Sequence, residues 1–271
     1  MSIRDDVTLR GFVERLLGWS NDRAVELAIR SLELAADRRA TLVLCGAGDM
    51  VPIAYALHRR TLGADRPFVV CDVRRRNALP SVRSPANIAN SAIAFGAARG
   101  GSLCVRASRP PPTFPSLVAR LRTTDDVNFV VCAHERDVEH PFLVRPAPIH
   151  LPPLADRAAE LDRVIAEYAA DAIAELGAPG AGFTAADHAW VREHAAASLA
   201  EVEKTTLRLV ALRMSPNTSN AAARLGIAPV SLGRWIGRRK LPPMLRPDQS
   251  EPRAPIESTM ALATGGGMTH R

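Results

Sequence analysis

The sequence predicts an α/β fold with a doubly wound parallel sheet, followed by a helical C-terminal part. Short apolar runs of β-like composition recur along the first half of the chain, with helical or loop material between them. Several runs are continuously apolar, which is typical of strands covered on both faces by helices. The five predicted strands are residues 40–45, 67–73, 101–107, 127–133 and 147–152.

Helical periodicity surrounds the predicted sheet. Apolar residues recur at helical spacing over residues 7–37 and again over 161–176, where a glycine follows as a stop signal. A Gly/Pro-rich break comes next, and Thr184 is expected to cap the following helix with its hydroxyl. The next helical run extends from 185 to about 213, and its continuity near residues 195–198 stays open.

The length and composition indicate a globular protein of the cytoplasm. The 271 residues are 47% apolar and 4% aromatic, which fits one sizeable core of Ala, Val, Leu and Ile plus a smaller module. No run of about 18 apolar residues is present, and the acidic N-terminus lacks the pattern of a signal peptide. We therefore expect no membrane contact.

The cysteines and histidines give no sign of a metal centre or a catalytic nucleophile. Close cysteine pairs, which a zinc site requires, are absent, and each cysteine lies in or beside an apolar run. We expect four buried reduced thiols, no catalytic residue, no metal and no other cofactor. The acid and histidine neighbours Asp187-His188 and Glu193-His194 are expected to be surface pairs. The cysteines are Cys45, Cys71, Cys104 and Cys132.

Positive charge is concentrated near the C-terminus. Residues 204–247 contain nine Lys or Arg and no Asp or Glu, so the rest of a chain of net charge +7 sums to about −2. Such a cluster gains binding energy on a phosphate backbone through counterion release, which indicates double-stranded DNA as a partner. The alternative is a solvated helical tail.

The residues within this basic part predict a helix-turn-helix. Two short helices around a glycine turn are expected over 217–241. Asn217 or Thr218 can cap the first helix, and Gly226 supplies the left-handed residue of the turn. The second helix, expected over 229–239, begins with a proline, whose fixed φ suits the first helical position.

The second helix is the predicted recognition helix. Leu232 and Ile236 should be buried, and Trp235 is expected to contact the core or the preceding helices instead of stacking on a base. Arg234 is the residue best placed for a bidentate contact with guanine. The residues expected to face DNA are Asn217, Thr218, Val230, Ser231, Gly233, Arg234, Arg238, Arg239 and Lys240.

A longer helix before the helix-turn-helix carries an apolar stripe. The stripe either pairs two subunits or packs within the chain, and the sequence leaves both interpretations open. Its residues are Leu199, Val202, Leu207, Val210 and Ala211.

The run GAGDMVPIAYALHRRTLGADRPFVVCDV (46–73) resembles the nucleotide-binding segment of bacterial enhancer-binding proteins, the AAA+ activators of sigma-54 RNA polymerase. Stretches 100–103, 127–138 and 148–161 follow in the family's order, and residues 199–241 resemble its Fis-type DNA-binding domain. The resemblance implies a P-loop NTPase-like (AAA+) sheet, a reduced helical lid and a Fis-type helix-turn-helix.

The resemblance and the composition together imply five segments. An N-terminal helical segment precedes a degenerate AAA+-like core, and a reduced lid precedes the DNA-binding domain and a disordered tail. In the same order, these segments are residues 1–37, 38–152, 153–195, 196–241 and 242–271.

The departures from the family pattern fall on its nucleotide-binding positions. The Gly-Lys pair that meets the phosphates falls on Asp49 and Met50, and a carboxylate repels a triphosphate. The Asp-Glu pair that holds Mg²⁺ and polarises the attacking water falls on Arg106 and Ala107. The positions of the degenerate nucleotide site are Gly46, Gly48, Asp49, Met50, Arg106, Ala107 and Glu135.

Further elements of the family are reduced. The asparagine with which the family senses the γ-phosphate falls on Glu135, and Arg145 is the nearest candidate for an arginine finger. The interval 73–99, which should carry the loop that contacts sigma-54, retains only AFGAA (94–98) as a remnant. The chain is therefore expected not to be an ATPase.

These observations predict a cytoplasmic, nucleoid-associated transcription regulator whose AAA+-like domain serves as a scaffold for oligomerisation or partner docking. A homodimer or higher oligomer is expected, with RNA polymerase or an active enhancer-binding protein as a further partner. Two alternatives stay open: an inactive subunit that modulates active sigma-54 activators, and a genuine ATP-dependent activator with displaced motifs.

Overall fold

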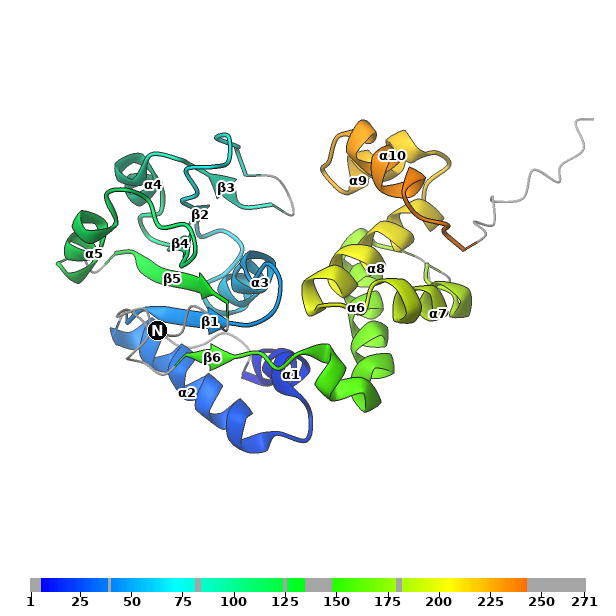
Figure 1. The fold of residues 1–271 in the computed structure, drawn as a ribbon, viewed down its shortest axis with the longest axis horizontal. Helices are drawn as coiled ribbons and strands as arrows, with labels where there is room; N and C mark the ends of the chain where they lie inside the picture. Colours follow the sequence, from blue (N-terminus) through cyan, green and yellow to red (C-terminus); the bar gives the residue numbers. More distant parts are fainter. Residues whose placement is uncertain are drawn as a thin grey trace, which may run out of the picture.

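The computed structural model describes residues 6–38, 40–80, 84–123, 126–134, 148–178 and 182–242. Its centre is a six-stranded parallel sheet with the strand order β3-β2-β4-β5-β1-β6 (Figure 1). The five predicted runs all form strands, so the predicted parallel α/β sheet is confirmed. The strands are β1 (Leu42–Cys45), β2 (Phe68–Val70), β3 (Ala86–Asn87), β4 (Ser102–Arg106), β5 (Asn128–Ala133) and β6 (Ile149–His150).

Helices cover both faces of the sheet, as the continuously apolar strands predict. Leu44 on β1 packs in the cluster that contains α1, α2 and α3, whereas its neighbours Val43 and Cys45 pack in the cluster that contains α4 and α5. The predicted helical segment 7–37 is two helices, which separate at Gly18 with φ 107°. The helices are α1 (Asp6–Leu17), α2 (Asp22–Arg38), α3 (Val51–Thr61), α4 (Ser91–Ala97) and α5 (Phe114–Arg122).

Helices α6 (Leu161–Leu176), α7 (Ala185–His194) and α8 (Leu199–Arg213) follow the sheet. Local signals in the sequence fix their ends. Gly177 terminates α6 with φ 62°, and Thr184 caps α7 through a reciprocal bond with Asp187. Helix α7 ends before α8 begins, and Ser198 between them accepts a hydrogen bond from the Glu201 amide. The open question of continuity near 195–198 is thereby resolved as two helices.

The apolar stripe of α8 is covered within the chain, because α8 packs along α6. Leu199, Val202, Val210 and Ala211 are buried, and Leu207 is half-buried. Of the two interpretations of this stripe, the structure supports intramolecular packing. Because these residues are covered within the chain, they are not exposed for pairing with a second subunit.

Two short helices, α9 (Thr218–Arg224) and α10 (Pro229–Gly237), form the predicted pair around a turn. Asn217 is the residue that caps α9, since its Oδ1 accepts from the Asn220 amide at 2.9 Å. Gly226 at the turn has φ 62°, as predicted. α10 ends at Gly237, two residues before the predicted end at 239.

The AFGAA remnant is not an exposed contact loop. Residues 94–98 lie in and directly after α4, and Ala94, Phe95 and Ala98 are buried against the sheet. Glu135, Arg145 and all but the first residue of the predicted tail 242–271 lie outside the described residues. Among the described helices, none combines the length and apolar character needed to cross a membrane.

Candidate functional site

The parallel strands bring several charged residues to one edge of the sheet. Asp49 follows β1, Asp72 follows β2 and Arg106 ends β4. Parallel strands all point their carboxyl ends to the same edge, and ligands of open α/β sheets bind in the crevice there. The predicted nucleotide site therefore lies at the expected edge.

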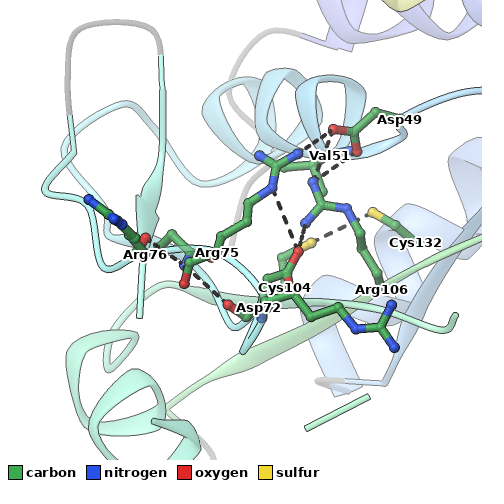
Figure 2. Close-up of polar contacts among 10 residues, drawn as sticks. Asp49, Val51, Asp72, Arg75, Arg76, Cys104, Arg106 and Cys132 are labelled. Atoms are coloured by element: carbon green, nitrogen blue, oxygen red, sulfur yellow. Dashed lines mark hydrogen bonds and ion pairs between the residues drawn. The ribbon is translucent and has the colours of Figure 1, made fainter. Parts of the chain in front are cut away.

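Arg106 is the centre of an ion-pair network at this edge (Figure 2). Its Nη1 lies 3.0 Å from Oδ2 of Asp72, and its Nη2 lies 3.1 and 3.0 Å from the two carboxylate oxygens of Asp49. The Arg75 guanidinium stands 3.7 Å from each of the two carboxylates. The side chain of Arg106 is 11% exposed and that of Asp72 is 1% exposed, so the Arg106–Asp72 pair is largely removed from water.

Backbone amides hold the two carboxylates in place for Arg106. Asp72 Oδ1 accepts from the Arg74 amide at 3.0 Å, and Asp49 Oδ1 accepts from the Val51 amide at 3.2 Å. Burial opposes the charge of Arg106, but the hydrogen bond that Arg106 donates to Asp49 and the negative charges around it outweigh burial, and the pKa of Arg106 is raised. The guanidinium therefore stays charged.

The network balances its own charge. Two carboxylates, Asp49 and Asp72, face two guanidinium groups, Arg75 and Arg106. The pocket beside them has a volume of about 230 Å³, below the range of roughly 300–1,000 Å³ that is usual for small-molecule sites. Arg109 also lines this pocket, beside the paired side chains of Asp49, Arg75 and Arg106.

The remaining predicted positions are placed as follows. Met50 is 4% exposed and packs into the core, and its Sδ lies 3.1 Å from the point where a Cβ on Gly46 would stand. Gly48 turns the loop with φ 83°. The Ala107 amide donates to the Cys132 carbonyl at 2.8 Å. The sequence assigned Asp49 only a repulsive role, whereas the structure gives it Arg106 as a partner.

Sequence reasoning missed Asp72 and Arg75. The available signal was the position of Asp72 at the end of the second apolar run, at the same edge as the loop after β1. The four cysteines are buried free thiols, as predicted, and Cys104 and Cys132 lie under Arg106 with their sulfur atoms 3.6 Å apart.

The predicted DNA-facing residues lie at the start of α9, on α10 and directly after α10. Val230 is 63% exposed, and Gly233 has no other atom within 4 Å of an added Cβ. Thr218 is half-buried at the start of α9. The fully exposed members of the predicted set are Asn217, Val230, Ser231, Gly233, Arg234, Arg238 and Lys240.

Arg239, which was predicted to face DNA, is half-buried and engaged within the chain. Its Nη2 lies 3.3 Å from Oε1 of Glu201, and its guanidinium stands 5.0 Å from the ring centre of Trp235. Arg208 stacks on the same ring at 5.0 Å. Part of the positive charge counted along the sequence is thus used to hold α10 against α8.

Arg213 is a second basic residue that is taken up within the chain. Its Nε and Nη2 each lie 2.8 Å from a carboxylate oxygen of Asp187, and the two side chains are 7% and 0% exposed. The expectation that Asp187 belongs to a surface pair with His188 is therefore wrong. The end of α8 meets the first turn of α7, and this contact buries Asp187.

Trp235 makes the predicted contact with the preceding helices. It is 6% exposed, and its ring meets that of Trp190 on α7 edge to face at 6.4 Å. The Trp190 indole also donates to the Lys240 carbonyl at 2.6 Å. The α9 and α10 pair is thus docked on α7 and α8 through aromatic packing and a buried hydrogen bond.

Comparison with known proteins gives distant structural similarity. No family model and no curated protein matches the sequence. A crystal structure of NtrX from Brucella abortus in complex with ADP is 14% identical, with a TM-score of 0.46 over 80% of this chain and 68% of that chain. The ATP complex of the same protein is 15% identical, with a TM-score of 0.43 over 79% and 67%. Similarity at this level carries no argument about family, ligand or activity.

Proposed function

We propose that this chain is a DNA-binding transcription regulator related to the sigma-54 AAA+ activators, with a nucleotide site that no longer works. Its AAA+-like domain, residues 38–152, acts as a scaffold for a homodimer or higher oligomer, or for docking to RNA polymerase. Residues 153–195 are the reduced lid and residues 196–241 the Fis-type domain. The site of action is the cytoplasm, on the nucleoid.

The pairing of Arg106 with Asp49 and Asp72 is the observation that supports the proposed loss of nucleotide binding and hydrolysis. Phosphoryl transfer needs a cation at the β- and γ-phosphates and carboxylate ligands for Mg²⁺. In this chain the loop after β1 offers a carboxylate and the end of β4 offers a guanidinium, and the two neutralise each other. A nucleotide would have to break this pair before it could bind.

Purified full-length protein is expected to hydrolyse ATP no faster than a no-protein blank, with or without duplex DNA and Mg²⁺. The measurement is phosphate release at protein concentrations where an active enhancer-binding protein, assayed beside it, gives clear turnover. Turnover above that blank would establish instead the genuine ATP-dependent activator with displaced motifs.

The observation that supports DNA binding is the exposure of Arg234 on α10 and of Arg238 and Lys240 directly after it, on a helix whose Trp235 packs against Trp190. Arg234 can make a bidentate contact with guanine, whereas Lys240 at the end of the helix suits a phosphate. Arg239, Arg208 and Arg213 contribute less, because each is engaged by other side chains.

Arg234→Ala is expected to weaken binding at one base position by about 1 to 3 kcal/mol and to relax specificity there. Lys240→Ala is expected to weaken binding to all DNA sequences alike and to reduce the slope of log K against log salt concentration by about 1. Titration of a duplex library over a range of salt concentrations measures both effects. A uniform loss across all sequences with Arg234→Ala would remove the base contact from the proposal.

The inactive-subunit alternative makes a different prediction about partners. A chain that joins rings of active relatives should co-purify with them through residues 38–152, and deletion of the helices after Met214 should leave this association intact. Association that depends on shared DNA would favour the regulator with its own operator.

A further inference from the structure

A second pocket lies between the sheet part and the helical part, and it shares no lining residue with the pocket beside Arg106. Its volume is about 600 Å³, within the range of roughly 300–1,000 Å³ that is usual for small-molecule sites. The outer face of α3 forms one wall, and α6 and α8 form the other (Figure 1). A molecule bound here would contact both parts of the chain.

Most of the charged groups around this pocket are paired with one another. Asp171 on α6 lies 2.6 Å from Arg15 on α1 and 3.6 Å from Arg60 on α3. Glu175, one turn along α6, lies 3.7 Å from Arg59. The arginines facing the pocket therefore already have carboxylate partners, which disfavours an anionic ligand.

Glu203 on α8 differs from these carboxylates. Within the described parts of the chain, no Lys, Arg or His nitrogen lies within 4 Å of its carboxylate, although Arg60 and Arg15 act on it from further away. Burial raises the pKa of Glu203 to about 7; Arg60 opposes this rise, and Glu175 and Asp171 add to it. The group lacks the cation that its surroundings would require.

Tyr168 on α6 supplies a second polar group without a partner. The residue is 3% exposed, and its hydroxyl makes no hydrogen bond. A buried hydroxyl left unpaired costs free energy, so such groups are uncommon unless something binds them. Burial raises the pKa of Tyr168, and the negative charge of Glu203 raises it further. Tyr168 and Glu203 both line this pocket.

The apolar part of the pocket completes the pattern. Pro52 and Tyr55 on α3 face Leu207 on α8, and Ala172 lies on the α6 wall. The charged lining residues are Arg59 and Arg60 against Asp171, Glu175 and Glu203, a difference of one unit of negative charge.

We propose that this pocket binds a small organic cation, a primary amine with an apolar body. The ammonium group, which has three donors and no acceptor, donates to the Glu203 carboxylate and to the Tyr168 hydroxyl oxygen. The apolar body packs between Tyr55 and Leu207. The bound amine bridges α3 to α6 and α8 and so links the sheet part to the helices that carry α9 and α10.

The test compares 2-phenylethylamine with the neutral 2-phenylethanol by calorimetry on the full chain, without DNA or ATP. The amine is expected to bind saturably and at least about tenfold more tightly than the alcohol, because a charge-assisted hydrogen bond exceeds a neutral one. Since neither DNA nor nucleotide enters the experiment, its failure would leave the proposed function untouched.

Binding is also expected to release a proton near pH 6 and very little near pH 8, because a nearby cation favours the ionised form of Glu203. Repeating the titration in two buffers of different ionisation enthalpy measures this proton. The groups that face Glu203 and could otherwise change charge are Tyr168, Asp171 and Glu175 on α6 and Arg59 and Arg60 on α3.

Glu203→Gln keeps the shape of the side chain and is expected to lower the amine affinity about tenfold or more and to abolish the proton release. Tyr168→Phe should lower the affinity about threefold to tenfold. Glu193→Gln, at a 77% exposed side chain on α7, should change neither. Equal binding of amine and alcohol, absence of saturable amine binding, or an unchanged affinity in Glu203→Gln would each overturn the proposal.

Discussion

Replacing Arg106 with Met is expected to lower the free energy of unfolding by about 3 to 5 kcal/mol, one of the two largest effects of a single substitution in this chain. Asp72 is 1% exposed and is held 3.0 Å from Arg106. Without the guanidinium, the Asp72 charge stays buried, and Arg75 at 3.7 Å is the other cation near it. Urea denaturation of the full chain, followed by circular dichroism, measures the change.

A matched control separates burial from charge pairing as such. Arg99 and Asp126 form an ion pair of 2.9 Å with side chains 67% and 40% exposed, and Arg99→Met should cost no more than about 1 kcal/mol. Combining Arg106→Met with Asp72→Asn should recover part of the loss, since the buried charge is then removed. If Arg106→Met proved as mild as Arg99→Met, the network would not be the element that holds this edge of the sheet.

Arg213→Met is the second substitution expected to have a large effect, about 3 to 5 kcal/mol on the free energy of unfolding. The Asp187 carboxylate that it leaves behind is fully buried, and it also accepts from the Thr184 amide at 2.9 Å. Loss of Arg213 therefore weakens both the contact between α7 and α8 and the cap of α7. Chemical denaturation again gives the measurement.

The DNA assay provides the second readout for Arg213→Met. Where the variant is folded, its salt slope should equal that of the unmodified protein, because the guanidinium is bound to Asp187 and not to phosphate. The control is Arg192→Met on α7, whose partner Asp162 is 2.8 Å away with both side chains more than half exposed, and it should cost about 0 to 1 kcal/mol. A salt slope that falls by about 1 in Arg213→Met would instead show that this residue contacts phosphate.

Local patterns in the sequence predicted much of the fold. Continuous apolar runs predicted five of the six strands. The caps at Thr184 and Gly226 were also predictable, because each depends on residues within three or four positions along the chain. β3 was missed because two residues at a sheet edge carry no period. The separation of α1 from α2 at Gly18 was missed as well, because helical spacing continues on both sides of it.

The arrangement at the carboxyl edge could not be predicted in the same way. Asp49 and Arg106 are 57 positions apart and meet only because β5 lies between β1 and β4 in the sheet. Considered singly, each residue indicated a defect in a nucleotide site. The sequence could not show that the two defects are each other's partner, since this depends on strand order and on the direction of two side chains.

Counting basic residues near the C-terminus likewise could not show which of them are free to contact DNA. Arg213 and Arg234 are equivalent in a list of basic residues, yet one is 7% exposed beside a buried acid and the other is exposed on α10. The acid lies on α7, outside the segment that was counted. Only the packing of α7 against α8 distinguishes the two arginines.

The internal ion pair of Arg106 also affects how the stability of the protein responds to its surroundings. When a ligand holds a cleft together, the stability gained depends on the free ligand concentration and falls when that concentration drops. Arg106 is part of the polypeptide, so every folded copy carries its own counter-charge at full occupancy. The stability that this pair gives to the edge of the sheet therefore does not depend on the concentration of any free ligand.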